Sequence, residues 1–410
     1  MNRKTFTLIE LLIGIFILTS IIGLIISIIK PTEIYKKARD NQRIVDLNFL
    51  ESNIKSYLLL ANTSSIYATS TFNRVFLSLV LPSFATNTNC KNYFPTLPDL
   101  PSGWEYVCSK TPTSTDGTGW IPIDFRNYMI YTITNLPLDP LNNSNYYYAF
   151  IANDTKFVLY TQLEDSKNPA SKNDNDNYPY LYSTGPNKRL LDQAQGLVGY
   201  WPFDEGTETI AYDYSGNGNN GTLLDASPTN ADGNTPPQWT TGKIGGALSF
   251  DGVDDYVDTL LIFNSPSRFT VIAWINLPIT QGTQKNIAGT SYRHPQLLIL
   301  GGNLVRIQFG APTGFPGVNS TISIPNNEWH HVVGTWNGIT LRIYIDGVLN
   351  NTYNPGSSPI NNTQYHFQIG AFGPPSAGLQ QVIQGLIDEV RIYNRALSDS
   401  EIKVLYEATK

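Results

Sequence analysis

The chain has 410 residues, more than one compact hydrophobic core usually organises, so two or three domains are expected. Its formal charge is -6, from 27 Lys and Arg against 33 Asp and Glu, and no basic stripe with interleaved aromatic residues occurs, which excludes nucleic acid as a partner. Charged residues make up only 15% of the chain, and the abundance of Gly, Asn, Thr and Tyr favours β-rich domains outside the cytoplasm.

An apolar segment opens the chain. From Leu8 to Ile29 it carries no charge except Glu10, and about 20 apolar residues can span the hydrocarbon core of a bilayer as a helix. Residues 1–30 are therefore predicted to be a signal and transmembrane helix. A cleaved secretory signal is disfavoured, because the apolar core is long and residues 30–31 end it without a small-residue cleavage site. A plain membrane anchor fits the length but leaves Glu10 unexplained.

The stretch KTFTLIELLIG at residues 4–14 offers an explanation of Glu10. It resembles the class III signal of bacterial type IV pilins and pseudopilins, which a prepilin peptidase cuts before a phenylalanine whose new amino group is then methylated. The resemblance implies that Phe6 is the mature N-terminus and that Glu10 pairs with the Phe6 amine of a neighbouring pilin subunit, since buried charges persist only as a satisfied pair. Thr5 departs from the family pattern, which has glycine before the cut, so cleavage at this position stays open.

Residues 31–190 are predicted to form an amphipathic pilin-like helix and a small β-sheet domain. Leu47, Leu50, Ile54 and Leu58 recur at helical spacing among charged residues. The stretches GTGWIPIDF (117–125), MIYTITNLPLDP (129–140) and NYYYAFIANDTKFVLYTQLED (145–165) are aromatic and β-branched, which predicts short strands. The order of LPLDP and YYYAF also resembles the sheet region of major pseudopilins.

The chain has two cysteines, Cys90 and Cys108, which lie close in sequence. Outside the cytosol a disulfide between them is expected, and two free thiols are the alternative. A zinc site is disfavoured, because no CxxC or HxxxH pattern accompanies them.

A polar loop, SKNDNDNYPY, follows at residues 171–180. Asp174 and Asp176 alternate there with asparagines, and these side chains offer the hard oxygen ligands that calcium prefers. Related pseudopilins bind calcium in a loop placed like this one. A solvated polar loop without a metal is the alternative.

Residues 191–196 are predicted to be a linker, and a new pattern fills residues 197–410. Short apolar runs are bounded by Gly, Asn, Asp or Pro, and YIDGVLN at 344–350 carries the Asp-Gly signal of a two-residue hairpin, so an antiparallel sandwich is expected. The order of GLVGYWPFDEG, GGALSFDGVDDYV, EWHHVVGTWNG and GLIDEVRIYNRALSDSEIKVLYE resembles the laminin-G-like, concanavalin A-like jelly roll. The predicted fold class is thus multidomain: a long N-terminal membrane and pilin helix, a small α+β pseudopilin-like domain, and an all-β jelly-roll sandwich.

The jelly-roll resemblance also implies a structural calcium ion at one edge of the sandwich. The family segments that meet there hold Asp204, Asn217, Asn219 and Asp388. A Gly-Asn loop can present carbonyl and amide oxygens together. Asp213, Asp251 and Asp254 are alternative ligands.

The sandwich is predicted to bind rather than to catalyse. Relatives of this fold that cut glycans carry E-x-D-x-x-E on one strand, and neither this motif nor a recognisable Ser/His/Asp order occurs. Domains of this kind usually bind glycans or proteins, and an exposed loop aromatic would suit sugar stacking, with Tyr292, Phe315 and Phe372 as candidates.

The function predicted from the sequence is a non-catalytic cell-surface adhesin, a minor subunit of a type IV pilus or related filament. It would stay in the bacterial cytoplasmic membrane through its N-terminal helix until assembly, with the bulk of the chain extracytoplasmic. Two alternatives stay open: a membrane-tethered carbohydrate-active ectodomain, and a pseudopilin of a secretion system.

Overall fold

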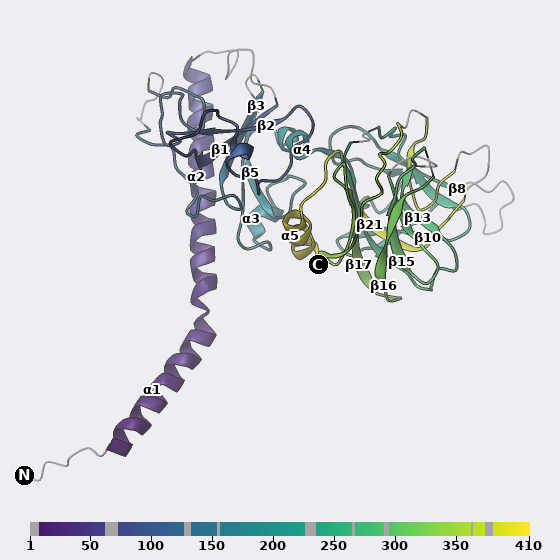
Figure 1. Ribbon diagram of the computed structural model, residues 1–410, viewed down its shortest axis with the longest axis horizontal. Helices are drawn as coiled ribbons and strands as arrows, with labels where there is room; N and C mark the ends of the chain where they lie inside the picture. Colours follow the sequence, from purple (N-terminus) through teal and green to yellow (C-terminus); the bar gives the residue numbers. More distant parts are fainter. Residues whose placement is uncertain are drawn as a thin grey trace, which may run out of the picture.

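The computed structural model of the protein describes residues 8–61, 73–126, 133–153, 156–225, 235–264, 267–290, 295–312, 314–361, 364–373 and 380–410. Two helices at the start of the chain lead into a small domain built on one sheet, and a two-sheet sandwich follows (Figure 1). The helices are α1 (Leu8–Ile29) and α2 (Pro31–Ala61). α1 projects beyond the rest of the molecule.

The predicted membrane-spanning helix is corrected by the structure. In the described part of the chain, no helix combines the length and the apolar character needed to cross a membrane. The fold class predicted above is therefore wrong in its long N-terminal membrane helix, and strands make up most of the described elements. Thr5 and Phe6 lie outside the described residues, as does the side chain of Glu10.

The second helix lies on the small sheet, as its apolar spacing predicts. Lys30 has a positive φ of 46° between the two helices, and Pro31 starts α2, where its missing N–H costs no helical hydrogen bond. Leu47, Leu50 and Ile54 are fully buried against the aromatic side chains of the sheet. This contact fixes α2 to the small domain.

The sheet of the small domain has the strand order β2-β1-β3-β4-β5, with β1 and β2 parallel and the other pairs antiparallel. Its strands are β1 (Arg74–Val80), β2 (Glu105–Ser109), β3 (Tyr148–Asn153), β4 (Lys156–Gln162) and β5 (Leu181–Thr184). β3 and β4 confirm the strands predicted at 145–165. Residues 117–125 form no strand, although Trp120, Ile121 and Ile123 are buried there. Most of the stretch 129–140 has no strand either, and residues 127–132 lie outside the described part.

A buried ion cluster joins α2 to the loops of the small domain. The guanidinium of Arg43 lies 2.7 Å from Asp139, 2.8 Å from Asp40 and 2.8 Å from Glu164. Asp139 also accepts hydrogen bonds from the backbone N–H groups of the turn that follows it. Because buried charges need partners, this set positions the helix on the sheet as well as stabilising it.

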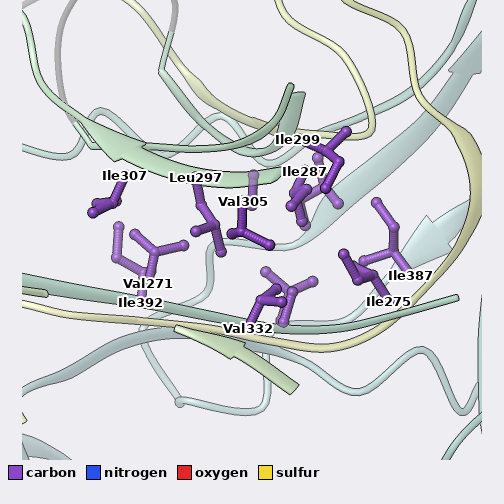
Figure 2. Close-up of a cluster of buried hydrophobic side chains, with 14 of the residues drawn as sticks. Val271, Ile275, Ile287, Leu297, Ile299, Val305, Ile307, Val332, Ile387 and Ile392 are labelled. Atoms are coloured by element: carbon purple, nitrogen blue, oxygen red, sulfur yellow. The ribbon is translucent and has the colours of Figure 1, made fainter. Parts of the chain in front are cut away.

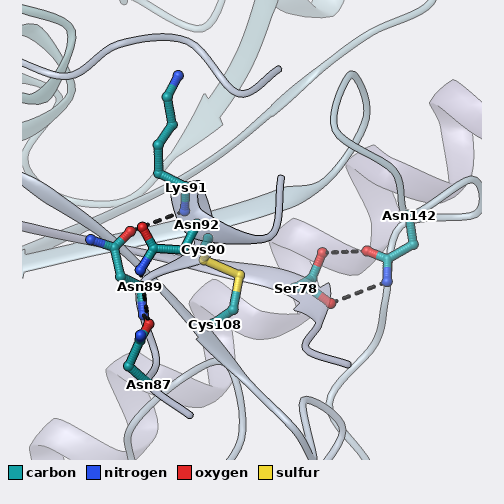
Figure 3. Close-up of a disulfide and its surroundings, with 8 residues drawn as sticks. All are labelled: Ser78, Asn87, Asn89, Cys90, Lys91, Asn92, Cys108 and Asn142. Carbon is teal, nitrogen blue, oxygen red and sulfur yellow. Dashed lines mark hydrogen bonds between the residues drawn. A yellow bond between two sulfur atoms is a disulfide. The ribbon is translucent and has the colours of Figure 1, made fainter. Parts of the chain in front are cut away.

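A disulfide joins Cys90 and Cys108, the pair predicted from the sequence (Figure 3). Cys90 begins the short 3-10 helix Cys90–Asn92, and Cys108 lies on β2. The side chain of Asn89 accepts a hydrogen bond from the backbone N–H of Lys91 and so caps this helix. The bridge therefore anchors an otherwise irregular segment to the sheet.

The sandwich begins after two short helices, α3 (Pro169–Lys172) and α4 (Arg189–Gln195). α4 occupies the predicted linker, because its apolar side chains are buried between the domains.

One sheet of the sandwich has the order β19-β18-β17-β12-β21-β10-β9, with β6 paired to β21, and the other has the order β16-β15-β14-β13-β20-β11-β8-β7. The strands of the first sheet are β6 (Leu197–Trp201), β9 (Gln238–Thr241), β10 (Gly246–Asp251), β12 (Phe269–Asn276), β17 (Trp329–Trp336), β18 (Leu341–Ile345), β19 (Val348–Tyr353) and β21 (Gln384–Tyr393). Those of the second are β7 (Ile210–Ala211), β8 (Gly221–Asp225), β11 (Asp255–Asp258), β13 (Lys285–Thr290), β14 (Gln296–Ile299), β15 (Leu304–Gln308), β16 (Gly317–Ser323) and β20 (Phe367–Ile369).

The core of the sandwich lies between its two sheets (Figure 2). Val271, Ile275 and Val332 from the first sheet meet Leu297 and Ile307 from the second. The hairpin predicted from YIDGVLN is present: Asp346 and Gly347, between β18 and β19, both have positive φ, at 51° and 75°. Because side chains alternate along each strand, each sheet also has an outer face that points away from this core.

The free face of the first sheet is covered by the small domain. On β12, Val271 and Ala273 point into the sandwich core, whereas Ile272 belongs to a second core shared with the small domain. The closing helix α5 (Asp399–Thr409) contributes to this shared core and lies between the two units in Figure 1. Its predicted capping box, Ser398 with Glu401, is formed. The outer face of the second sheet does not take part in this shared core.

Candidate ligand site

The outer face of the second sheet is polar where β14 and β15 run side by side. Leu297 and Ile307 point inward and face one another across the pair. Gln296 on β14 and Gln308 on β15 are direct cross-strand partners on the other face. Because side chains alternate along a strand, burying the apolar set in the core places the glutamines outside it.

A chain of hydrogen bonds fixes these glutamines. Gln308 donates from Nε2 to Oε1 of Gln296, 2.6 Å away, and Gln296 donates from Nε2 to the carbonyl of Thr290, 2.7 Å away. The two amides are nearly inaccessible, with 1% of Gln296 and 6% of Gln308 exposed. They therefore form a rigid polar floor with one fixed amide orientation.

Arg306, also on β15, continues this chain. It donates from Nε to Oε1 of Gln308 at 2.6 Å, from Nη1 to Oδ1 of Asn319 at 2.7 Å, and from Nη2 to the carbonyl of Phe315 at 3.0 Å. All three acceptors are neutral, and among the described residues no carboxylate lies within ion-pair distance. Burial lowers the pKa of Arg306 from its ordinary value.

The cavity above this floor has a volume of about 310 Å³. Two of the three aromatic residues predicted as ligand candidates, Phe315 and Phe372, line it. Phe315 is 46% exposed, whereas Phe372 is buried. The remaining lining residues are Gln284, Gln296, Leu300, Arg306, Gln308 and Gln381. The third candidate, Tyr292, lies outside the described residues.

The cavity thus combines apolar rings with converging amide and guanidinium groups. Its size falls at the lower end of small-ligand sites, in which a few polar groups fix orientation within apolar walls. Glutamine amides can both donate to and accept from hydroxyl groups, and aromatic faces offer apolar contact. Of the described residues that line the cavity, none is Asp or Glu. The arrangement can hold a polyhydroxylated ligand, and no carboxylate pair flanks it.

The structure divides the predicted calcium ligands of the sandwich between two turns. Asp204 accepts a hydrogen bond from the N–H of Gly246, and Asp388 accepts from the N–H groups of Lys243 and Ile244, so both hold the turn before β10. Their clustering follows from the antiparallel pairing of β6 with β21.

Asn217 and Asn219 lie on the other turn. Each donates from its side-chain amide to the carbonyl of Val198 on β6. Asp213, an alternative ligand, accepts from the N–H of Tyr200 and of Asn219. In the described part of the chain no group of three or more Asp, Glu, His or Cys is placed to hold a metal. The other two alternative ligands, Asp251 and Asp254, lie at and beside the end of β10.

Asp388 is more deeply buried than the other predicted ligands. It is fully buried, and its Oδ1 has no hydrogen-bond partner in the described structure. Burial and the neighbouring Glu389 carboxylate raise the pKa of Asp388 to about 8. A buried carboxylate oxygen without a hydrogen-bond partner would suit a cation, and Oδ2 of Asp176 and Oδ2 of Asp251 also lack a partner in the described structure.

In the predicted calcium loop of the small domain, the carboxylates already accept several backbone hydrogen bonds. Asp174 accepts hydrogen bonds from the N–H groups of Asp176 and Ser183, and Asp176 accepts from that of Tyr178. Burial raises the pKa of both carboxyl groups, and the ammonium of Lys188 lies close enough to act on them electrostatically. A lysine thus supplies positive charge beside the carboxylates assigned to calcium.

Sequence reasoning found the aromatic residues of the cavity but missed Gln296, Arg306 and Gln308. The signal available was the alternation of Arg306 and Gln308 with apolar residues in LVRIQ, whereas Gln296 only precedes the apolar run in QLLI. Such alternation is the ordinary pattern of any strand with one solvated face, so it does not distinguish a ligand site.

Three solved structures are similar to part of this chain. Domain 4 of the extracellular GH43 arabinanase AbnA from Geobacillus stearothermophilus, solved with arabinotriose, is 21% identical, with 51% of this chain and 97% of that chain covered and a TM-score of 0.40. The binding domain of Paraclostridial Mosquitocidal Protein 1 is 16% identical, with 52% of each chain covered and a TM-score of 0.40. Trypanosoma rangeli sialidase, solved with sialic acid, is 18% identical, with 63% of this chain and 43% of that chain covered and a TM-score of 0.36.

The chain therefore spans about half of that toxin domain and less than half of that sialidase. A comparison with curated protein sequences gave no match. The family model described as the concanavalin A-like lectin/glucanases superfamily matches residues 251–403, which include β11 to β21 and the start of α5. Residues 251–403 are thus similar to the concanavalin A-like lectin/glucanases superfamily.

Proposed function

We propose that this protein is a non-catalytic glycan-binding protein that works outside the cytoplasm, with the cavity on β14 and β15 as its ligand site. The observation that carries the proposal is the joint placement of Phe315 and Phe372 around a rigid floor of buried glutamine amides. Sugars present apolar C–H faces and rings of hydroxyl groups, which such a site satisfies together.

The domain arrangement supports binding to an external partner. The shared core buries the outer face of the first sheet against the small domain, so the cavity lies on the face directed away from it. The disulfide between Cys90 and Cys108 supports an extracytoplasmic location, since such bonds persist in oxidising compartments. A glycan on another cell surface, or a glycosylated protein, is the partner that this geometry favours.

The non-catalytic part of the proposal rests on the lining of the cavity. Hydrolysis of a glycosidic bond needs two carboxyl groups that flank it, and no Asp or Glu is among the described residues that line the site. A glycan that binds should therefore be recovered intact after long incubation, and release of new reducing ends would contradict this part.

Glycan-array binding of the purified full chain tests the proposal directly. Phe315→Ala should weaken binding of any glycan that the array identifies by about tenfold. Tyr353→Ala is the matched control, because Tyr353 is 45% exposed, close to the 46% of Phe315, but lies on β19 of the opposite sheet. Equal losses in the two variants, or no glycan bound at all, would contradict the assigned site.

We also propose that α1 joins this chain to other pilin-like subunits in a filament. The support is the resemblance at residues 4–14 and the exposure of α1, where Leu8 and Phe16 are 76% and 73% exposed. Contiguous exposed apolar surface usually marks an interaction site. Mass spectrometry of the mature N-terminus should show methylated Phe6, and Glu10→Ala should reduce incorporation into sheared filaments.

Calcium remains a proposal for the sandwich, with Asp388 and Asp204 as the ligands. The support is the buried Oδ1 of Asp388, which has no hydrogen-bond partner in the described structure, and the attachment of both carboxylates to one turn. The ion would stabilise this turn and would not take part in chemistry.

A further inference from the structure

Arg306 is an unusual component of a site for neutral sugars. A half-buried guanidinium is ordinarily paired with a carboxylate, because a desolvated charge needs compensation. The acceptors around Arg306 are a glutamine, an asparagine and a backbone carbonyl. No acid of the described chain forms an ion pair with it, and burial alone accounts for its lowered pKa.

The neighbours of Arg306 hold it in place without neutralising it. Gln308 is itself fixed by Gln296, and Gln296 by the carbonyl of Thr290, so the chain of amides is anchored at both ends. A guanidinium has five N–H donors, and the described contacts use three of them. Two donors therefore remain on a rigid cation that lines the cavity.

From this arrangement we infer that the ligand of the cavity is an acidic glycan, whose carboxylate or sulfate group pairs with Arg306 while a sugar ring packs on Phe315. The inference rests on the proposed glycan-binding function and specifies its ligand class. Guanidinium pairs with planar or tetrahedral oxyanions are among the strongest charge-assisted hydrogen bonds. Arg306 also donates to the carbonyl of Phe315, so the cation and the aromatic ring are positioned together.

Because the protein has a net negative charge, a preference for acidic ligands depends on the local cation Arg306. At -6, the chain as a whole repels anions, so a preference for acidic sugars would have to come from a specific pair. Such a pair at a partly buried site is screened less by salt than an exposed one. Preference for the anion should therefore persist at physiological ionic strength.

The experiment compares charged and uncharged forms of one glycan on the full chain by isothermal titration calorimetry at about 0.15 M salt. Tri-galacturonate is compared with its methyl ester, 3′-sialyllactose with the methyl ester of its sialic acid, and a sulfated disaccharide with its desulfated form. The first two comparisons test for recognition of a carboxylate, and the third tests for recognition of a sulfate. We expect at least one charged probe to bind tenfold or more tightly than its uncharged form.

Two variants test the residue. Arg306→Gln should remove the preference for the charged probe, because it should weaken binding of that probe far more than binding of the uncharged form. Arg306→Lys should retain part of the preference, because it keeps the charge but loses the fork geometry. Arg342→Gln is the control: it makes the same change in net charge on β18, where Arg342 pairs with Asp399. Melting temperatures confirm that each variant is folded.

Each remaining outcome overturns a defined statement. Equal affinity of the wild type for charged and uncharged probes would overturn the acidic ligand and leave glycan binding intact. Loss of both probes in a folded Arg306→Gln variant would make Arg306 a support for the Phe315 loop only. An equal effect of Arg342→Gln would assign the preference to general charge. No binding of any probe, or of any glycan on the array, would overturn the proposed function as well.

Discussion

Arg395 and Gln195 are 200 residues apart in sequence, yet Nη2 of Arg395 donates to Oε1 of Gln195 across 2.7 Å. The same guanidinium lies 2.7 Å from Glu401 on α5, and all three side chains are buried. α4, α5 and the end of the sandwich thus meet at one cation. This contact fixes the orientation of the sandwich on the small domain and leaves the cavity on the opposite face.

Replacing Arg395 with Met should destabilise this junction. The change leaves Glu401 buried without its partner, and loss of one member of a buried pair typically costs about 3–5 kcal/mol. Urea unfolding of the full chain should show the loss, with the sandwich unfolding apart from the small domain. Arg342→Gln removes an exposed pair and should cost no more than about 1 kcal/mol. Equal unfolding free energies of the Arg395→Met and Arg342→Gln variants would contradict a stabilising role for the buried contacts of Arg395.

The disulfide should stabilise the small domain in particular. Cys90 and Cys108 are 18 residues apart, and closing a loop of this size restricts the unfolded chain by about 3 kcal/mol. The double variant Cys90→Ala/Cys108→Ala should lose stability by that order, and reductant should lower the melting temperature of the wild type but not of the variant. A reductant effect of the same size in both would exclude the bridge as its cause.

Gly334 is required by the close approach of the two sheets. A Cβ at this position of β17 would lie 2.5 Å from the side chain of Ile307 on β15. Gly334→Ala should therefore overpack the core and cost about 1–3 kcal/mol of unfolding free energy. Adding Ile307→Val should recover part of the loss, because it removes a methyl group from the same contact. Independent, additive losses in chemical denaturation would show that the two positions do not touch.

The pH dependence of stability should reveal Asp388. Its pKa is raised from 3.8 to about 8, because burial and Glu389 disfavour the charged form. The neutral form contributes stability that is fully present below pH 4 and is lost as pH rises towards 8, on the order of a few kcal/mol. Asp388→Asn removes this loss, so its advantage over the wild type in chelator should grow between pH 4.5 and pH 8. If the melting temperatures of the wild type and of Asp388→Asn change in parallel across this pH range, the raised pKa of Asp388 is contradicted.

Calcium should oppose that loss in the wild type. A metal that binds only the folded state stabilises it by about 2.7 kcal/mol at a hundredfold excess over its dissociation constant. The melting temperature of the full chain at pH 8 should rise with calcium and rise less with magnesium, which demands tighter octahedral geometry. Asp388→Asn should reduce the response, whereas Asp174→Asn in the small domain should not. A flat response in the wild type would remove the metal from Asp388.

Residue patterns within short stretches of the sequence were sufficient to predict several elements. The spacing of Leu47, Leu50 and Ile54 predicted the face that α2 buries, and Ser398 with Glu401 predicted the start of α5. Asp346 and Gly347 predicted a hairpin, because few other residues adopt two successive positive φ values. These features depend on residues within a few positions of one another, so no tertiary information was needed.

Features that depend on distant segments were decided by the tertiary structure. Residues 191–196 look like a linker in sequence, but residues 191–195 form part of α4, because the shared core buries its apolar side chains. The apolar run at 8–29 predicted a membrane helix, which the described part of α1 does not support.

The ligand site shows the same division. Phe315 and Phe372 stood out in the sequence as loop aromatics, whereas the glutamines and Arg306 looked like the solvated face of ordinary strands. Strand order placed β14 beside β15, and register placed Gln296 opposite Gln308. The sequence by itself therefore determined several local elements and the resemblance of the C-terminal part to a jelly roll. Only the tertiary structure decided which polar groups converge, because cross-strand neighbours are chosen by pairing between segments and not by spacing along the chain.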